Sequence, residues 1–355
     1  CVSAIELDFE SSETLISHIV PIPIHKFSNF FYYTAFLLIV PFYIIYLSSK
    51  HRFSAIFSFG SYYTLIVAIP AFIFRTPLYM LLRSSPWNHK KRLERIVGIR
   101  YLLEIFDYLA YLFAKKVIFP AEYLKDLFAI KYPFFSKKVI FYPYGTLLKS
   151  NQSIEEVKKS SFEKWIKFNQ KQDKGLRAQY GLPEKSLLLV TSGVIDESKN
   201  LELVIRAMSA SEIDTICLII CGDGPDKNRL QALAYGLGLS ETVIFLGWIK
   251  NPKEIISGSD VFILPSNDHK ISTSLYEALG LGLPVLAADT PITREILIHN
   301  QLLFDPNNVE LCAAVLRKIA IDKKELRNFQ ELCYKRAQEL AFDWVEDLFN
   351  NLQFK

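Results

Sequence analysis

Four apolar runs in the second half of the sequence end in small and polar residues that could hold an anion. The four segments are TSGVIDESKN (191–200), CGDGPD (221–226), LGWIKNP (246–252) and PSNDHKISTS (265–274). They contribute Gly193, Gly222, Gly224, Gly247 and Ser266. Glycine lets backbone N–H groups approach a ligand closely, and a helix N-terminus adds positive potential. Tight-turn geometry explains a single glycine equally well, whereas the four segments together predict an anion site.

Two charged residues beside these segments extend the predicted chemistry. Lys199 can lead a helix while its ammonium faces a diphosphate, although a lysine at a helix start is usually solvated. Glu277 is a single acid in the apolar helix that follows Ser272, Thr273 and Ser274. Its carboxylate could accept hydrogen bonds from ligand hydroxyls, or it could form a capping box with Ser274. A ligand with both a diphosphate and vicinal hydroxyls is a nucleotide sugar.

Strands and helices alternate around these residues. The predicted strands of the second half cover 186–193, 215–222, 242–247, 260–266 and 284–289. Their runs are continuously apolar, as in parallel strands buried on both faces, so we predict a doubly wound α/β fold. The first half repeats the pattern in predicted strands at 54–60, 77–83, 116–121 and 138–145. Two such sheets, facing each other, enclose a cleft beyond the carboxyl ends of their strands.

A polar stretch divides the chain into two predicted Rossmann-like domains. Residues 1–145 form the first, with a start that we expect to be incomplete because the sequence opens without a methionine. Residues 146–180 are the predicted hinge and 181–340 the second domain, whose loops would hold the nucleotide sugar. Residues 341–355 are expected to form a helix that can cross back to the first domain. The five cysteines show no Cys-x-x-Cys spacing, which favours reduced thiols.

Charge is distributed unevenly between the two halves. Residues 1–150 carry 17 Lys+Arg and 9 Asp+Glu, a net +8, and the remainder carries 24 and 28, a net −4. A basic, apolar half favours an anionic membrane surface over nucleic acid as partner. The basic run 88–95 is either a solvated helix face or a further contact with headgroups.

Two uncharged runs, 27–49 and 53–74, are long enough to span a bilayer. The second also reads as a strand, a turn at Gly60 and a buried helix. We therefore expect peripheral attachment to a membrane, and an integral membrane protein is the alternative.

Three stretches of the second half resemble the donor domain of the GT-B glycosyltransferases, in particular the retaining group called family four. They are GVIDESKNLELVIRAM (193–208), CGDGPDKNRLQALAYGLGLSETVIFLGWI (221–249) and DVFILPSNDHKISTSLYEALGLGLPVLAADTPITREIL (260–297). The resemblance implies that Lys199 grips the diphosphate. It also implies that Glu277, the second glutamate of a Glu-x7-Glu motif, holds the ribose. A later glutamate of the family is present as Glu295, although Thr290 and Pro291 replace the two glycines that usually precede it.

The sequence departs from the family pattern at several functional positions. The first glutamate of the motif falls on His269, beside Asp268, and the arginine of the first loop is Val194. The histidine at the end of one strand of the first half corresponds to Arg83. We expect His269 or Asp268 to hydrogen-bond the sugar hydroxyls and Arg83 to offset the charge of the leaving group. An ordinary loop histidine is the alternative for His269.

The resemblance implies a two-domain GT-B enzyme that transfers a sugar with retention of configuration. The donor would be a nucleotide sugar of UDP or GDP type, and the acceptor a lipid-linked saccharide or a cell-envelope polysaccharide. No Asp-x-Asp occurs in the chain, so we expect no metal and no further cofactor. The expected location is cytoplasmic, peripheral on the inner face of the membrane. The departures leave a non-catalytic GT-B-like subunit, which binds a partner or a membrane, as the alternative.

Overall fold

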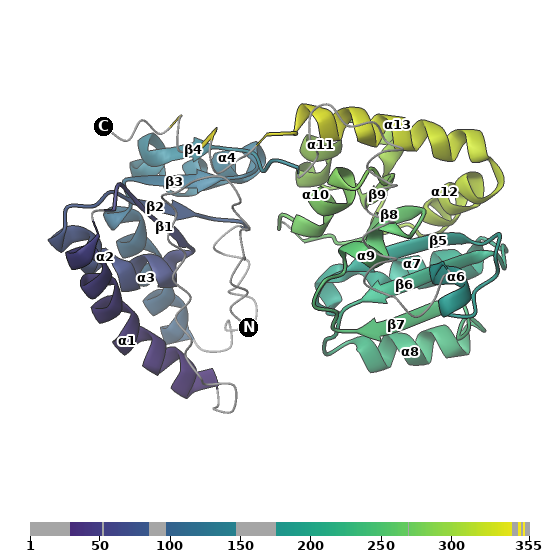
Figure 1. Cartoon of the computed structure of the whole chain (residues 1–355), viewed down its shortest axis with the longest axis horizontal. Helices are drawn as coiled ribbons and strands as arrows, with labels where there is room; N and C mark the ends of the chain where they lie inside the picture. Colours follow the sequence, from purple (N-terminus) through teal and green to yellow (C-terminus); the bar gives the residue numbers. More distant parts are fainter. Residues whose placement is uncertain are drawn as a thin grey trace.

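Two parallel β-sheets with helices around them make up the structure, a computed structural model (Figure 1). It describes residues 29–51, 53–84, 97–146, 175–268, 270–342, 347–348 and 351. The first sheet has four strands in the order β1-β2-β3-β4, and the second has six in the order β10-β9-β8-β5-β6-β7. The predicted α/β class with two Rossmann-like sheets is confirmed. Of the predicted hinge, residues 147–174 lie outside the described residues.

The second sheet contains every strand that the sequence predicted for it. Its strands are β5 (Leu187–Ser192), β6 (Ile216–Cys221), β7 (Val243–Gly247), β8 (Val261–Leu264), β9 (Val285–Ala288) and β10 (Leu303–Phe304). All six residues of β6 are buried, because helices cover the sheet and its continuously apolar strands need shielding on both faces. Only β10 was not predicted, since two residues give no periodic signal.

Some of the helices of the second half begin at a side-chain cap. They are α6 (Leu176–Gln179), η3 (Glu197–Lys199), α7 (Leu201–Ala210), α8 (Lys227–Gly236), α9 (Lys253–Ser257), α10 (Thr273–Gly280), α11 (Pro291–Leu297), η4 (Asn300–Leu302), α12 (Val309–Ile321) and α13 (Lys323–Glu339). Asn308 caps α12 by accepting from the N–H of Leu311 at 3.0 Å. Thr290 and Thr293 form a reciprocal capping box at the start of α11. The four described cysteines are buried and free.

The first sheet is smaller and carries longer helices. Its strands are β1 (Ile56–Phe59), β2 (Leu78–Leu81), β3 (Lys116–Phe119) and β4 (Val139–Phe141), and its helices are α1 (Asn29–Lys50), α2 (Ser61–Ile73), α3 (Val97–Phe113), α4 (Glu122–Lys131) and η2 (Pro133–Lys138). The four strands match the predicted ones. The second uncharged run forms β1, a turn at Gly60 with φ +85°, and α2, as its second interpretation predicted.

None of the helices that the structure describes combines the length and the apolar character needed to cross a bilayer. The basic run 88–95 lies outside the described residues.

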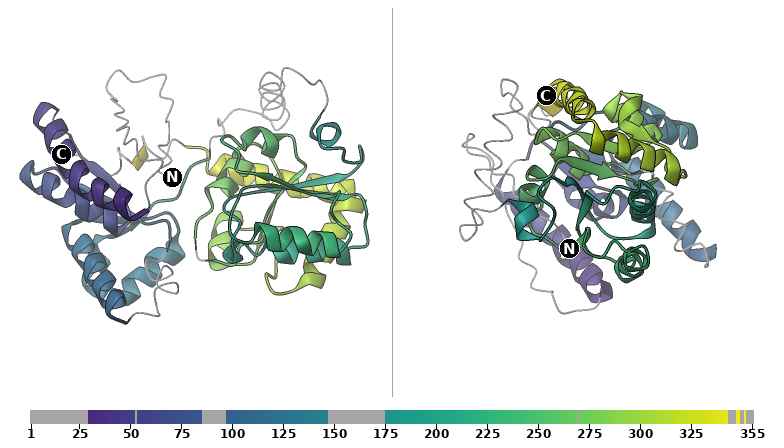
Figure 2. Two further views of the ribbon diagram at one scale, coloured as in Figure 1. Left: turned by 90° about the horizontal axis from the view of Figure 1, so that it is seen from below. Right: turned by 90° about the vertical axis from the view of Figure 1, so that its right-hand side faces the viewer.

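The two halves meet at several direct contacts and are joined along one side (Figures 1 and 2). The rings of Tyr144 and Tyr276 pack edge to face at 5.7 Å between centroids. After β4 the chain runs beside the residues that follow α13: Thr146 donates from its N–H to the Leu340 carbonyl at 2.7 Å and from Oγ1 to the Ala337 carbonyl at 2.8 Å. Further along the chain, the Tyr142 hydroxyl of the first half donates to the carboxylate of Asp347.

Candidate functional site

A cavity of about 770 Å³ lies between the two halves, at the carboxyl ends of the strands. The first half contributes the β1–α2 turn (59–63), the end of β2 (81–84) and two residues of α3. The second half contributes residues 192–194 after β5, Lys199, and residues 270–274 before and at the start of α10. This is the position that parallel α/β sheets give to a ligand, because the loops that leave the strands converge there.

Lys199 brings a positive charge into this cavity. It ends the short helix η3, which Asp196 caps by accepting from the Ser198 N–H at 3.1 Å. Its stem passes over Gly193, where an added Cβ would lie 3.7 Å from the Lys199 Cε. Within the described residues no carboxylate pairs with the ammonium, so its charge is available to a ligand. Gly193 and Lys199 are therefore brought together as predicted, although Lys199 precedes α7 rather than leading it.

The start of α10 lines the same side of the cavity, beside these loops, with residues Ser272, Thr273 and Ser274. Ser272 is the N-cap, and the first N–H groups of a helix have no partner within the helix. Ser274 Oγ donates to the carbonyl of Ser192 at 3.2 Å and lies 3.0 Å from Ser272 Oγ. The alternative of a capping box between Ser274 and Glu277 is wrong, because Ser272 is the N-cap and the Ser274 hydroxyl binds Ser192 instead.

Glu277 lies one turn further along α10 and is partly buried. Burial raises the pKa of its carboxyl group above the ordinary value, and the positive charge of Lys253 acts in the opposite direction. No described group donates a hydrogen bond to this carboxylate. It does not line the 770 Å³ cavity. A partly buried carboxylate without a donor is suited to accept hydrogen bonds from ligand hydroxyls that reach past the start of α10.

Ser266 occupies a small recess beside the same loops. Its hydroxyl is buried and has no hydrogen-bond partner among the described residues. Thr191, Gly193 and Lys199 line the same recess. A buried hydroxyl without a partner costs free energy, which a polar ligand group can recover.

Gly222, Gly224 and Gly247 do not line the cavity. An added Cβ at Gly222 would collide with the carbonyl oxygen of Gly193, and one at Gly224 with that of Ile195. Gly247 has φ +73° and forms a bridge with Gly222. These glycines let neighbouring loops pack closely, so tight-turn geometry accounts for them.

The positions that depart from the family pattern differ in their surroundings. Asp268 is only 10% exposed, and its carboxylate pairs with Lys270 Nζ at 3.3 Å. Arg83 lines the cavity, and its backbone carbonyl accepts from the N–H of Ile271 at 3.1 Å. Burial raises the pKa of Tyr144 to about 12, with the charge of Arg83 acting to lower it. His269 lies outside the described residues.

Sequence reasoning missed the way Glu295 links the two halves. Its carboxylate accepts hydrogen bonds from the N–H groups of Glu122 at 2.6 Å and Tyr123 at 3.1 Å, the first two residues of α4. The N-cap of α4 is Ala121, which offers no side-chain acceptor. Because this N-cap is apolar, the sequence could have indicated that the start of the helix needs an acceptor from elsewhere in the chain. It could not have indicated which residue supplies that acceptor. Lys270 in the cavity wall was also missed.

No group of three or more His, Cys, Asp or Glu side chains in the described part of the chain is arranged to hold a metal ion.

Comparison with solved structures identifies the fold. An Anabaena HepE structure in complex with UDP-glucose superposes with a TM-score of 0.68 at 19% identity, covering 90% of this chain and 83% of that one. The likeness shows the GT-B fold.

Among curated proteins, the O-antigen biosynthesis glycosyltransferase WclY of Escherichia coli is 26% identical over 179 residues, 50% of each chain. The sulfoquinovosyl transferase SQD2 of Arabidopsis thaliana is 31% identical over 182 residues, 49% of this chain and 34% of its own. The chain thus spans half or less of the length of these relatives. The family model described as "Glycosyl transferases group 1" matches residues 172–336. In sequence, this segment of the chain is therefore similar to the group 1 glycosyltransferases.

Proposed function

We propose that this chain is a retaining glycosyltransferase that uses a nucleotide sugar of UDP or GDP type. The observation that carries the proposal is the cavity in which Lys199 and the start of α10 face Arg83 from the other half. An ammonium and free helix N–H groups stabilise a departing diphosphate, which is where negative charge develops in sugar transfer. The family match of residues 172–336 supports the same reaction class.

In the proposed reaction the bond between the anomeric carbon and the diphosphate oxygen breaks, and the electron pair stays on the diphosphate. The acceptor hydroxyl forms the new bond from the same face and gives up its proton, so the configuration is retained. Lys199 and the α10 amides hold the diphosphate, and the Glu277 carboxylate accepts hydrogen bonds from the ribose hydroxyls. Asp268 reaches the sugar hydroxyls once it releases Lys270. No metal is needed, because these groups supply the positive charge, and activity is expected to survive EDTA.

The acceptor that we propose is a lipid-linked saccharide or an envelope polysaccharide. The support is the character of the first half, where residues 1–150 carry a net +8 and the helices expose apolar side chains. The name of WclY, an O-antigen biosynthesis enzyme, points to the same class of product in a relative. We place the chain on the cytoplasmic face of the membrane.

The test is a thermal-shift screen with UDP, GDP and ADP, followed by mass spectrometry of the products formed from matching nucleotide sugars. A nucleotide at 100 times its dissociation constant is expected to stabilise the chain by about 2.7 kcal/mol. Asp268→Ala should keep the nucleotide shift but lose sugar transfer. A full set of donors and acceptors without any product would contradict the proposed activity.

A non-catalytic GT-B-like subunit is the second candidate, and Val194 favours it. This apolar side chain lines the cavity and is exposed where the family pattern has an arginine. A chain that binds no nucleotide in the screen, yet is folded, would support this second candidate.

A further inference from the structure

The loops at the amino edge of the first sheet collect positive charge. Because β1 to β4 are parallel, the residues that precede them lie at one edge, opposite the 770 Å³ cavity. Among the described residues, the cations just before or at the start of the four strands are Lys50, Arg75, Lys115, Lys116, Lys137 and Lys138. Helices α1, α2 and α3 end at the same edge, since each leads into one of these strands.

Some of these cations already donate hydrogen bonds to backbone carbonyls of the first half. Lys138 Nζ donates to three carbonyls at the end of α3, with distances of 2.8 to 3.2 Å, and so offsets the negative helix end. Lys116 Nζ donates to the carbonyl of Lys137 at 3.1 Å. Arg75 and Lys115 are different: within the described residues neither side chain has a carboxylate or carbonyl partner. The Lys115 ammonium lies 5.8 Å from the centre of the Tyr79 ring.

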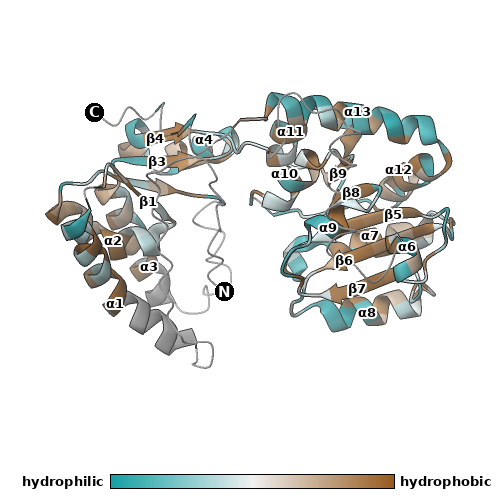
Figure 3. Ribbon diagram, in the orientation of Figure 1, coloured by the Kyte–Doolittle hydropathy of each residue, from teal (hydrophilic) through white to brown (hydrophobic). Residues whose placement is uncertain are grey.

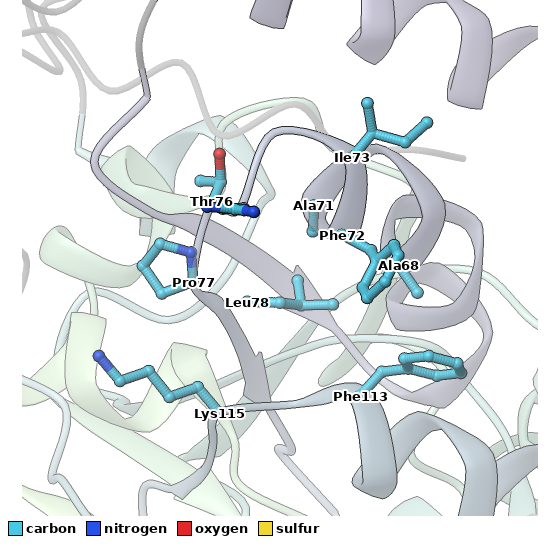
Figure 4. A pocket seen from close by; sticks show the side chains of 10 residues that line it. Ala68, Ala71, Phe72, Ile73, Thr76, Pro77, Leu78, Phe113 and Lys115 are labelled. Carbon is cyan, nitrogen blue, oxygen red and sulfur yellow. The ribbon is translucent and has the colours of Figure 1, made fainter.

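Arg75 and Lys115 border a second cavity, of about 830 Å³, at this edge (Figure 4). Its other lining residues include Phe72, Leu78 and Phe113. Figure 4 shows Leu78 between the rings of Phe72 and Phe113 on one side and the Lys115 chain on the other. Phe72 is 80% exposed and Phe113 50% exposed. The cavity therefore combines an apolar floor with two available positive charges.

The apolar surface continues from this cavity along α3. The inner side of the helix buries Ala110 and Tyr111 completely. Within residues 101–113, whose side chains the structure describes, the outer side exposes eight residues, all of them apolar or aromatic: Tyr101, Leu102, Ile105, Phe106, Tyr108, Leu109, Leu112 and Phe113. A helix that faces water carries polar residues there, and a large exposed apolar patch marks an interaction surface. Hydrophobic residues also run along α1 and α2 (Figure 3).

We infer that the Arg75–Lys115 cavity binds the headgroup of an anionic phospholipid, while the outer side of α3 and the end of α2 rest on the bilayer. The bilayer is the occupant that fits, because it offers negative charge and apolar groups side by side. A second copy of this chain would bring two positively charged edges together. This inference rests on the membrane location given under the proposed function, and it adds the site and the lipid class.

The test is flotation of the full chain with phosphatidylcholine vesicles, with and without phosphatidylglycerol. We expect binding to the anionic vesicles, weakened by high salt. The double variant Arg75→Gln with Lys115→Gln should bind about 30-fold more weakly, the equivalent of two charges worth about 1 kcal/mol each. The matched control Lys323→Gln with Lys324→Gln removes two exposed charges from α13 and should bind like the unaltered chain.

A second variant, Phe72→Ser with Phe113→Ser, should also lose binding to anionic vesicles. Equal losses in the α13 control would overturn the inference, because binding would then depend on total charge rather than on this cavity. A concentration-dependent dimer that the Phe variant abolishes, without flotation of the unaltered chain, would overturn it in favour of a second copy.

Nucleotide binding and transfer to a soluble saccharide should be unchanged in the Arg75 and Lys115 variant. Flotation can therefore fail while transfer persists, or persist while transfer fails, so the two proposals are separable.

Discussion

The two halves of this molecule bury their strands alike but present their helices to the surroundings differently. All six residues of β6 and all four of β2 are buried. On the outside, α13 exposes charged residues such as Lys323 and Lys324, whereas the outer side of α3 exposes eight apolar ones. Helix α13 of the second half thus presents charged side chains to the surroundings, and helix α3 of the first half presents apolar ones.

The difference between the halves can be measured first with the same substitution on each side. Leu189→Ala in β5 removes a fully buried side chain and should lower the free energy of unfolding by about 2–5 kcal/mol. Leu102→Ala on α3, where the leucine is 52% exposed, should change it by less than about 0.5 kcal/mol. Denaturant unfolding of both variants checks this. A large loss at Leu102 would mean that another part of the chain covers α3.

A smaller effect is expected when the chemistry of the second half is removed. Lys199→Ala should lower kcat/KM for sugar transfer by about 100-fold, because the charge on the leaving diphosphate loses its cation. Steady-state kinetics measure this, with Lys324→Ala on the outside of α13 as the control. If the Lys199 variant turned over like the control, the cavity assigned to the donor would be the wrong one.

The contact between the halves should show a weaker effect again. Glu295→Ala leaves the first two N–H groups of α4 without their acceptor and should cost about 0.5–2 kcal/mol. Asp322→Ala removes a comparable cap, because Asp322 accepts from the Lys324 N–H at 2.8 Å, but it acts within the second half alone. Unfolding followed by separate probes in the two halves distinguishes them. In the Glu295 variant, the unfolding transitions of the two halves should become less coincident, and in the Asp322 variant they should stay coincident. If the two transitions coincided in both variants, Glu295 would not link the halves.

The smallest effect concerns pH and Glu277. Burial raises the pKa of this carboxyl group in the folded chain. The folded state then binds the proton more readily, so stability falls as pH rises from the ordinary pKa of about 4.3 through the raised value. Glu277→Gln should therefore be slightly more stable than the unaltered chain at pH 7, with no difference below about pH 4. Thermal melts of this variant and of the control Glu331→Gln on α13 check this. The melting temperature of the control at pH 7 should not rise.

Much of this organisation could be predicted from the sequence. Continuously apolar runs identified nine strands, and the order of strands and helices identified the fold class, because both follow from local periodicity. Lys199, Gly193 and Ser272 were placed at one cavity since parallel strands deliver their loops to one edge. The parts that escaped prediction depend on tertiary contacts. Nothing local to Glu295 shows that it caps a helix 172 residues earlier, and nothing local to Asp268 shows its pairing with Lys270.

The roles of the glycines were also hard to predict from the sequence. Gly222 and Gly224 looked like ligand-facing residues, yet each is needed where a neighbouring carbonyl leaves no room for a Cβ. The sequence marks a close approach of the backbone at such a position. It does not say whether a ligand or another loop makes that approach.

The chain passes between the two halves beside its own return. Thr146, leaving the first sheet, is hydrogen-bonded to the carbonyls of Ala337 and Leu340 in the segment that comes back, and Gly145 has no room for a Cβ against the Phe342 carbonyl. Where it passes between the halves, the chain is thus held to itself by Gly145 and Thr146 on one side and Ala337, Leu340 and Phe342 on the other. Any movement that separated these two segments would break both hydrogen bonds of Thr146.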